Sequence, residues 1–156
     1  MHPQAALAIA ELGLVAHPEG GYYREIYRSA TNVRAADGRG RPALTVIYFL
    51  LESTKCSTWH RLKSDETWHF ARGHLVLELI AGDGAHERLE LNPEGPWQAT
   101  IPAGTAFAAR ARSDYALVTC CVAPGFAFED FELLDPGRLR ARYPEHSETI
   151  ARYARQ

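Results

Sequence analysis

The sequence predicts an all-β domain with a short helix near its N-terminus and short helices near its C-terminus. Its 156 residues, 46% of them hydrophobic, suffice for one sizeable core and are too few for two ordinary domains. About ten short apolar or alternating segments are separated by turn residues, a pattern typical of a β-sandwich or barrel. We therefore expect a single domain over residues 1–156, with a β-barrel at about 20–134 and a helical cap at 136–154.

The elements follow from local patterns. Residues 3–12 predict an amphipathic helix that ends at Gly13, with an apolar face of Ala6, Leu7, Ala10 and Leu14. Residues 37–42, rich in glycine and arginine, predict a mobile loop. Alternating or continuous apolar runs predict strands at residues 22–28, 44–51, 57–62, 66–71, 75–81, 86–91, 97–101, 107–111, 115–123 and 128–134.

The charge and the cysteine content of the sequence limit the partners and the cell compartment that we expect for this protein. Seventeen basic and nineteen acidic residues give a formal charge of −2 with no basic block, which argues against nucleic acid or an anionic membrane as a partner. No basic leader precedes an apolar stretch and no run could span a bilayer, so we expect a cytoplasmic protein. Cys56 and the adjacent Cys120 and Cys121 make a poor disulfide framework, and we expect the adjacent pair to be small strand residues on opposite faces.

One short segment concentrates chemically active side chains. The run His60-Arg-Leu-Lys-Ser-Asp-Glu66-Thr-Trp-His69-Phe-Ala-Arg-Gly73 places imidazoles, carboxylates and an indole in a β-rich hairpin. Polar side chains in a strand pair are costly unless they face water, pair with one another or bind something. Function should be sought in this run.

Four segments together resemble the cupin superfamily, and within it the DUF985 or Cupin_5 family. They are His17-Pro-Glu-Gly-Gly-Tyr-Tyr-Arg-Glu25, Thr45-Val-Ile-Tyr-Phe-Leu-Leu51, the hairpin from His60 to Gly73, and Pro124-Gly-Phe-Ala-Phe-Glu-Asp-Phe-Glu132. The resemblance implies a double-stranded β-helix, which is a jelly-roll barrel with an internal pocket for a small molecule. It also implies a homodimer.

The general cupin motifs bear on a metal cofactor. This sequence matches the first motif at His60, Glu66 and Gly73, but Leu62 stands where a second histidine belongs and Phe107 where the second motif has its histidine. A facial iron or manganese site needs about two imidazoles and a carboxylate. No cofactor is therefore favoured. A divalent metal would need His60, Glu66 and His69, and His69 lies at an odd offset from Glu66 that only a β-bulge would reverse.

His60 and Glu66 are the expected catalytic residues, because a histidine and a carboxylate brought together inside a barrel form a common proton-transfer site. Alternatively, His60 is a partly exposed strand histidine bonded to a neighbour, and Glu66 is a hairpin residue that faces solvent. The aromatic residues among the candidates are equally consistent with ordinary core packing. The expected substrate-binding residues are Trp68, His69, Phe70, Phe107, Tyr23 and Arg24.

Two further segments leave their orientation open. In residues 17–25, Tyr22, Tyr23, Arg24 or Glu25 would reach the pocket or a dimer contact, or the segment is a plain turn with Glu19 and Arg24 exposed. In residues 126–134, a strand that buries Phe131 and Leu133 would direct Asp130 and Glu132 to the other face, towards a pocket or towards solvent.

Three functions are compatible with the sequence. The first is a metal-independent isomerase or epimerase of a sugar or sugar nucleotide, in which His60 paired with Glu66 transfers a proton. The second is a metal-dependent oxygenase or isomerase. The third is a metabolite-binding or sensing module without catalysis.

Overall fold

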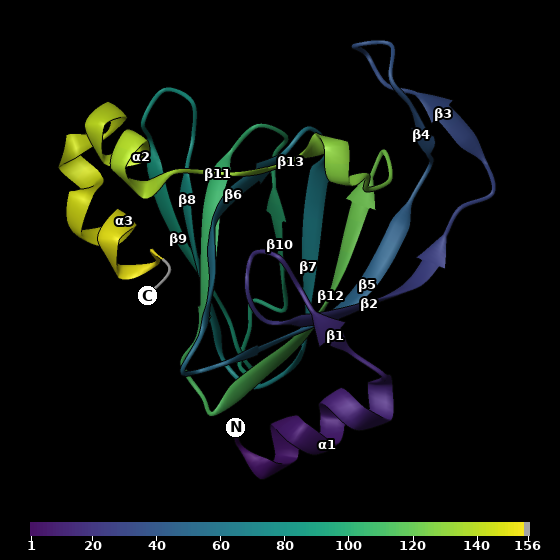
Figure 1. Ribbon diagram of the computed structural model, residues 1–156, viewed down its shortest axis with the longest axis vertical. Helices are drawn as coiled ribbons and strands as arrows, with labels where there is room; N and C mark the ends of the chain where they lie inside the picture. The colour runs from purple at the N-terminus through teal and green to yellow at the C-terminus, as the bar shows by residue number, and fades with distance from the viewer. Residues whose placement is uncertain (155–156) are drawn as a thin grey trace.

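The computed structural model describes residues 1–154 and contains two facing antiparallel sheets, as the predicted jelly roll requires (Figure 1). The six-stranded sheet has the order β1-β2-β5-β12-β7-β10, with the strands Val15–Ala16, Tyr22–Arg28, Thr45–Glu52, Tyr115–Ala123, Asp65–Arg72 and Gln98–Ile101. The five-stranded sheet has the order β13-β6-β11-β8-β9, with the strands Phe131–Leu133, Cys56–Leu62, Ala106–Ala111, Leu75–Ile80 and His86–Leu91.

The core lies between the two sheets and is made by alternate residues of the strands. Phe49, Leu51, Trp68, Leu77 and Val118 belong to one buried cluster drawn from both sheets. Because side chains alternate across a strand, the same strands direct other residues outward. The adjacent cysteines behave in this way, since Cys120 is buried and Cys121 is partly exposed.

Helices cover two sides of the barrel. Helix α1 (Pro3–Leu12) ends at Gly13, whose φ of +62° closes the helix as predicted. Its buried face is formed by Ala5 and Ala8, whereas Leu7, expected on the apolar face, is 61% exposed. Helices α2 (Pro136–Arg142) and α3 (Ser147–Arg152), with the 3₁₀ turn η2 (Pro144–His146) between them, lie beside β8 and β9 (Figure 1). Within residues 1–154, no helix is long and apolar enough to cross a membrane.

Two segments differ from the sequence-based expectation. Part of the predicted loop at 37–42 is strand β4 (Gly40–Pro42), which pairs with β3 (Asn32–Arg34) in a hairpin that projects from the barrel (Figure 1). The predicted strand at 128–134 begins instead with a 3₁₀ turn, η1 (Phe128–Asp130), and only Phe131–Leu133 forms β13. The reason is visible in the contacts, because Asp130 is buried and ion-paired to Arg39 and Arg41 of the hairpin.

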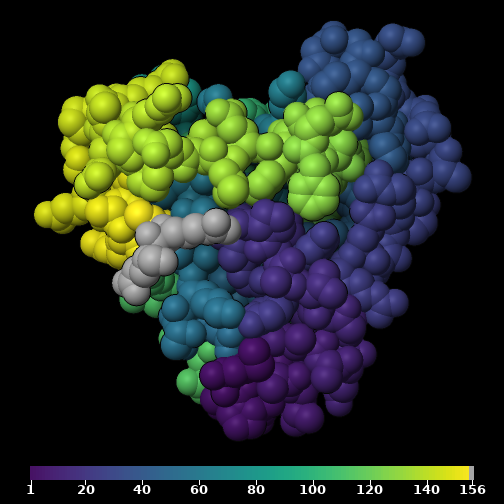
Figure 2. Space-filling model, in the orientation of Figure 1, coloured from purple at the N-terminus to yellow at the C-terminus, as the bar shows by residue number. Residues whose placement is uncertain are grey.

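The segment that carries η1 crosses one face of the molecule between the C-terminal helices and the hairpin (Figure 2). Besides Arg39, two further arginine contacts attach it to neighbouring elements. Arg28 of β2 donates to the Phe126 carbonyl at 3.3 Å, and Arg41 donates to both carboxylate oxygens of Asp130 at 2.7 and 2.9 Å. These bonds hold the aromatic side chains of residues 126–131 over one end of the barrel.

Candidate functional site

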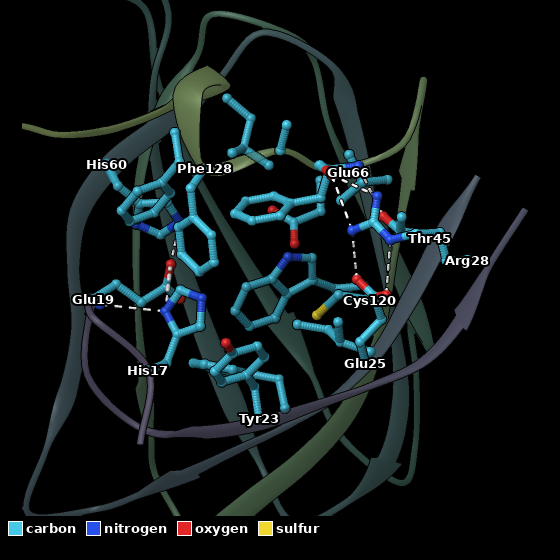
Figure 3. A pocket seen from close by; sticks show the side chains of 18 residues that line it. His17, Glu19, Tyr23, Glu25, Arg28, Thr45, His60, Glu66, Cys120 and Phe128 are labelled. Atoms are coloured by element: carbon cyan, nitrogen blue, oxygen red, sulfur yellow. Dashed lines mark hydrogen bonds and ion pairs between the residues drawn. The ribbon is translucent and has the colours of Figure 1, made fainter. Parts of the chain in front are cut away.

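A cavity of about 420 Å³ opens at this end of the barrel (Figure 3). Its lining comes mainly from β2, β5, β6, β7 and β12, from the loop before β2, and from residues 126–131. The volume is in the range of small-molecule pockets. In Figure 3, His17, Glu19 and His60 gather on one side of the cavity, and Glu25 and Arg28 lie on the other.

His60 and Glu19 form a buried pair. Nε2 of His60 lies 3.0 Å from Oε2 of Glu19, and both side chains are more than nine-tenths buried. Nδ1 of His60 lies 2.7 Å from the Thr58 carbonyl, which can only accept, so Nδ1 carries a proton. Ser57 Oγ donates to the other Glu19 oxygen at 2.7 Å. A contact of 3.0 Å between Nε2 and Oε2 requires one proton between them, so the pair is neutral overall.

Burial decides where that proton lies. It lowers the pKa of His60 to about 4, although the bond to the Thr58 carbonyl opposes the shift. It raises the pKa of Glu19, although His17 and Ser57 oppose that shift. Both directions favour a protonated Glu19 that donates to a neutral His60. The imidazole lines the cavity and packs against Phe107, with the ring centroids 4.0 Å apart.

His17 is a second histidine in contact with Glu19. Its Nδ1 accepts the Glu19 backbone N–H at 3.3 Å and lies 3.5 Å from Glu19 Oε2. Burial lowers the pKa of His17, so the ring is neutral near pH 7 with its proton on Nε2. The ring meets Tyr23 edge-on at 4.6 Å between centroids. His17 and Tyr23 both line the cavity, and His17 offers it an N–H donor.

Glu66 is the second buried carboxyl group of the cavity. Burial raises its pKa to about 8. The Trp68 indole and the Cys120 thiol act to lower its pKa, but the effect of burial is larger. Glu66 is therefore largely protonated near pH 7. A carboxylic acid that stays neutral at this pH can donate a hydrogen bond or a proton, as a general acid must.

The opposite side of the cavity carries a charged pair near solvent. Arg28 Nε and Nη2 donate to the two oxygens of Glu25 at 2.9 and 2.7 Å, and both side chains are partly exposed. Among the lining residues in the described chain, Arg28 is the only lysine or arginine. Because Glu25 neutralises it, the lining carries no unpaired permanent cation.

The structure brings three of the predicted site residues to the cavity together with His60. They are Glu66, Trp68 and Tyr23. The predicted pairing of His60 with Glu66 is replaced by the contact between His60 and Glu19. Whether any of these residues takes part in binding or catalysis stays a prediction.

The other four predicted residues lie outside the lining. His69 is on the opposite face of β7 from Glu66, because β7 keeps a regular register with β12 from Glu66 to His69. Phe70 packs against the core cluster, and Phe107 is 1% exposed behind the His60 ring. Arg24 points away from the cavity and donates to the Leu12 carbonyl at 3.1 Å.

Sequence reasoning did not assign a role to His17, Glu19, Arg28 or Cys120. Glu19, expected to be exposed if its segment were a plain turn, is 5% exposed. The feature of the sequence that could have indicated this burial is the pair of glycines, Gly20 and Gly21, that follows Glu19. Gly20 has a φ of +109°, and a Cβ there would collide with the Cys56 carbonyl oxygen. Only glycine lets the loop approach β6 closely enough to place Glu19 beside His60.

Comparison with known proteins agrees with this architecture. A jelly-roll barrel with a ligand-sized cavity is the general plan of the cupins, and this chain belongs to the cupin superfamily. Residues 6–134 match the family model "Cupin superfamily (DUF985)", so it is a member of the DUF985 family. No curated protein matches it.

Solved structures extend the likeness over nearly the whole chain. A hypothetical protein from Leishmania major is 36% identical with a TM-score of 0.91, covering 97% of this chain and 99% of its own. A protein from Shewanella oneidensis is 35% identical with a TM-score of 0.88, covering 99% of both chains. Oxalate decarboxylase from Bacillus subtilis is 16% identical with a TM-score of 0.60, covering 89% of this chain and 36% of its own, and shares the fold.

One neighbouring structure of that decarboxylase is described by its Mn(II) centres, which raises the question of a metal in this cavity. The donor set present here does not fit one. Leu62 and Phe107 occupy two positions that supply ligands in the general motif, and Nε2 of His60 already faces Glu19. Within residues 1–154, no three His, Cys, Asp or Glu side chains are grouped to hold a metal ion.

Proposed function

We propose that this protein binds a small uncharged molecule in the barrel cavity and catalyses a proton transfer on it, as an isomerase or epimerase does. Glu66 is the acid in this proposal, and the pair of Glu19 and His60 is the base. The observation that carries it is the cavity-facing Glu66, held protonated by burial near a second buried carboxyl that is coupled to a histidine. Groups whose pKa values are displaced in this way are characteristic of acid–base sites.

The proton transfer follows from the contacts. Glu19 takes a proton from a carbon of the ligand while its own proton passes to Nε2 of His60, 3.0 Å away. The bond from Nδ1 to the Thr58 carbonyl stabilises the imidazolium that forms. Glu66 delivers its proton to the ligand oxygen that gains electron density. Reversal of the steps at the neighbouring carbon, or on the opposite face of the same carbon, completes isomerisation or epimerisation.

The charges of the lining favour a free sugar or similar polyhydroxy compound over a sugar nucleotide. Glu19, Glu25 and Glu66 all line the cavity, and Arg28 is already bonded to Glu25. A diphosphate would enter this cavity without a free cation to pair with it, which costs free energy. The aromatic side chains of Phe49, Trp68 and Phe131 offer flat apolar surfaces of the kind that stack against a sugar ring.

Deuterium exchange tests the proposal without knowledge of the product. The purified protein is incubated in D₂O with small aldoses and ketoses, including erythrulose, and loss of the proton beside the carbonyl is followed by NMR. We expect exchange with the unaltered protein and a decrease of about 100-fold or more in Glu66→Gln and Glu19→Gln. The exposed Glu87→Gln is the matched control and should exchange normally.

Two results would contradict the proposal. One is exchange that persists in both Glu66→Gln and Glu19→Gln. The other is a sugar that raises the melting temperature of the protein but exchanges no deuterium, which would favour a binding or sensing module.

A further inference from the structure

The three tryptophans of this chain differ in how their indole N–H groups are satisfied. Trp59 Nε1 donates to the Ile150 carbonyl at 3.0 Å, and Trp97 Nε1 donates to the Pro93 carbonyl at 3.0 Å. Trp68 is 1% exposed, yet its Nε1 makes no hydrogen bond of acceptable geometry within the described chain. A buried donor without a partner costs free energy, so its presence calls for an explanation.

The unsatisfied N–H lies at the cavity. Trp68 and Glu66 are two residues apart on β7, in a stretch of regular register with β12, so both side chains are on the same face of the sheet. Both residues line the cavity. The indole N–H also lies close enough to the Glu66 carboxyl group to lower its pKa, although this contact falls short of the geometry of a hydrogen bond. Two neutral donors, the indole N–H and the carboxylic O–H, are therefore adjacent at the cavity surface.

We propose that Trp68 Nε1 and the Glu66 carboxyl group together bind the carbonyl oxygen of an uncharged hydroxyaldehyde or hydroxyketone. This inference rests on the proposed function and names its substrate class. An oxygen acceptor would satisfy the indole N–H, which no side chain or backbone group of the described chain does. A carboxylate ligand is a poorer fit, because it would bring a full negative charge into a buried site that has no free cation to pair with it.

The pair of donors has a defined part in the reaction. When a proton leaves the carbon beside the carbonyl for Glu19, its electron pair forms the carbon–carbon double bond of an enol, and the carbonyl oxygen takes the proton of Glu66. No oxidant or reductant is needed. Trp68 transfers no proton, and its N–H stabilises the oxygen as negative charge develops there. Donors already positioned at such an oxygen are a common source of transition-state stabilisation.

The indole N–H resonances provide a direct test on the unaltered protein. Protein labelled with ¹⁵N is titrated with erythrulose, an open-chain hydroxyketone, and separately with erythritol, which lacks the carbonyl. We expect erythrulose to shift the Trp68 N–H proton downfield and to leave Trp59 and Trp97, which are already bonded, unchanged. Erythritol should bind about tenfold more weakly, because its hydroxyl is a poorer acceptor for two donors.

Variants separate the two donors. Glu66→Gln keeps a donor at this position, so erythrulose should bind within about threefold of the unaltered protein even though proton transfer is lost. Trp68→Phe removes the N–H and should weaken erythrulose binding by about tenfold without affecting erythritol, whereas the exposed Trp97→Phe should change neither. If Trp68→Phe does not fold, the resonance shift in the unaltered protein decides the question.

The inference is overturned if saturating erythrulose leaves the Trp68 resonance in place, if it fails to bind, or if erythritol shifts the resonance equally. These outcomes are distinct from failure of the proposed function. Deuterium exchange without a Trp68 shift would reject the carbonyl subsite and leave proton transfer intact. A Trp68 shift without exchange would support the subsite and reject catalysis.

Discussion

Glu19 Oε2 and His60 Nε2 lie 3.0 Å apart, although Glu19 belongs to a loop before β2 and His60 to β6 in the opposite sheet. The backbone holds the two segments together, because the Thr58 N–H donates to the Glu19 carbonyl at 2.9 Å. Ser57 Oγ fixes the other carboxyl oxygen. The acid of the loop therefore completes a site whose histidine comes from the barrel wall.

Removing the Glu19 carboxyl should destabilise the protein. Glu19→Ala leaves His60 Nε2 and Ser57 Oγ buried without partners, which we expect to cost about 2 kcal/mol in the free energy of unfolding. Glu19→Gln keeps a donor for His60 and an acceptor for Ser57, so its stability should be nearly unchanged. Urea denaturation of both variants at pH 7 measures the difference. Equal stabilities would show that the buried pair contributes nothing to the fold.

The stability of the protein should fall as the pH rises above neutrality. Glu66 has a folded-state pKa of about 8 against an ordinary 4.5, so the folded chain keeps a proton that the unfolded chain releases between these values. His60 has the opposite effect, but only between about 4 and 6.5. Between pH 6.5 and 8 we therefore expect Glu66 to cost about 2 kcal/mol of stability.

Glu66→Gln isolates this contribution, because the amide does not titrate. Denaturation curves at several pH values should show the fall above pH 6.5 in the unaltered protein and a flatter profile in the variant. A variant whose stability falls just as steeply would assign the effect to another group.

Substitution of Gly20 should disturb the site through the backbone. In Gly20→Ala the new methyl group would meet the Cys56 carbonyl oxygen at a φ of +109°, so the loop must move away from β6. We expect a loss of several kcal/mol in stability or a displaced Glu19 with lost proton exchange. Gly38→Ala is the control, since it also has a positive φ but its Cβ meets nothing within 4 Å. Similar losses in both would attribute the effect to φ alone.

The ion pairs of Asp130 should hold the projecting hairpin against the segment over the cavity. Asp130→Ala leaves Arg39 and Arg41, both mostly buried, without this partner, and we expect a loss of about 3 kcal/mol. Trypsin should then cut faster at these arginines. Glu129→Gln, at an exposed carboxyl that also contacts Arg41, should have little effect. Unchanged cleavage in Asp130→Ala would mean that other contacts hold the hairpin.

The sequence predicted the barrel well because strand periodicity and turn residues are local signals. The bounds of β2 and β9 agree fully, and the alternation that separates Glu66 from His69 is visible in the register. The partner of His60 was not predictable from these patterns. The contact with Glu19 depends on a loop that only tertiary packing places against β6, and η1 replaces the start of a strand because Asp130 pairs with a distant hairpin.

The proposed proton transfer depends on the protonation state of Glu66, which can be measured directly. Protein labelled with ¹³C at glutamate carboxyl carbons is titrated by NMR, with the Glu66 signal assigned by its absence in Glu66→Gln. We predict a titration with a pKa of about 8, so that the group is an acid at neutral pH. A pKa near the ordinary 4.5 would contradict the proposed role of Glu66 as the acid, because the group would then be a carboxylate with no proton to give.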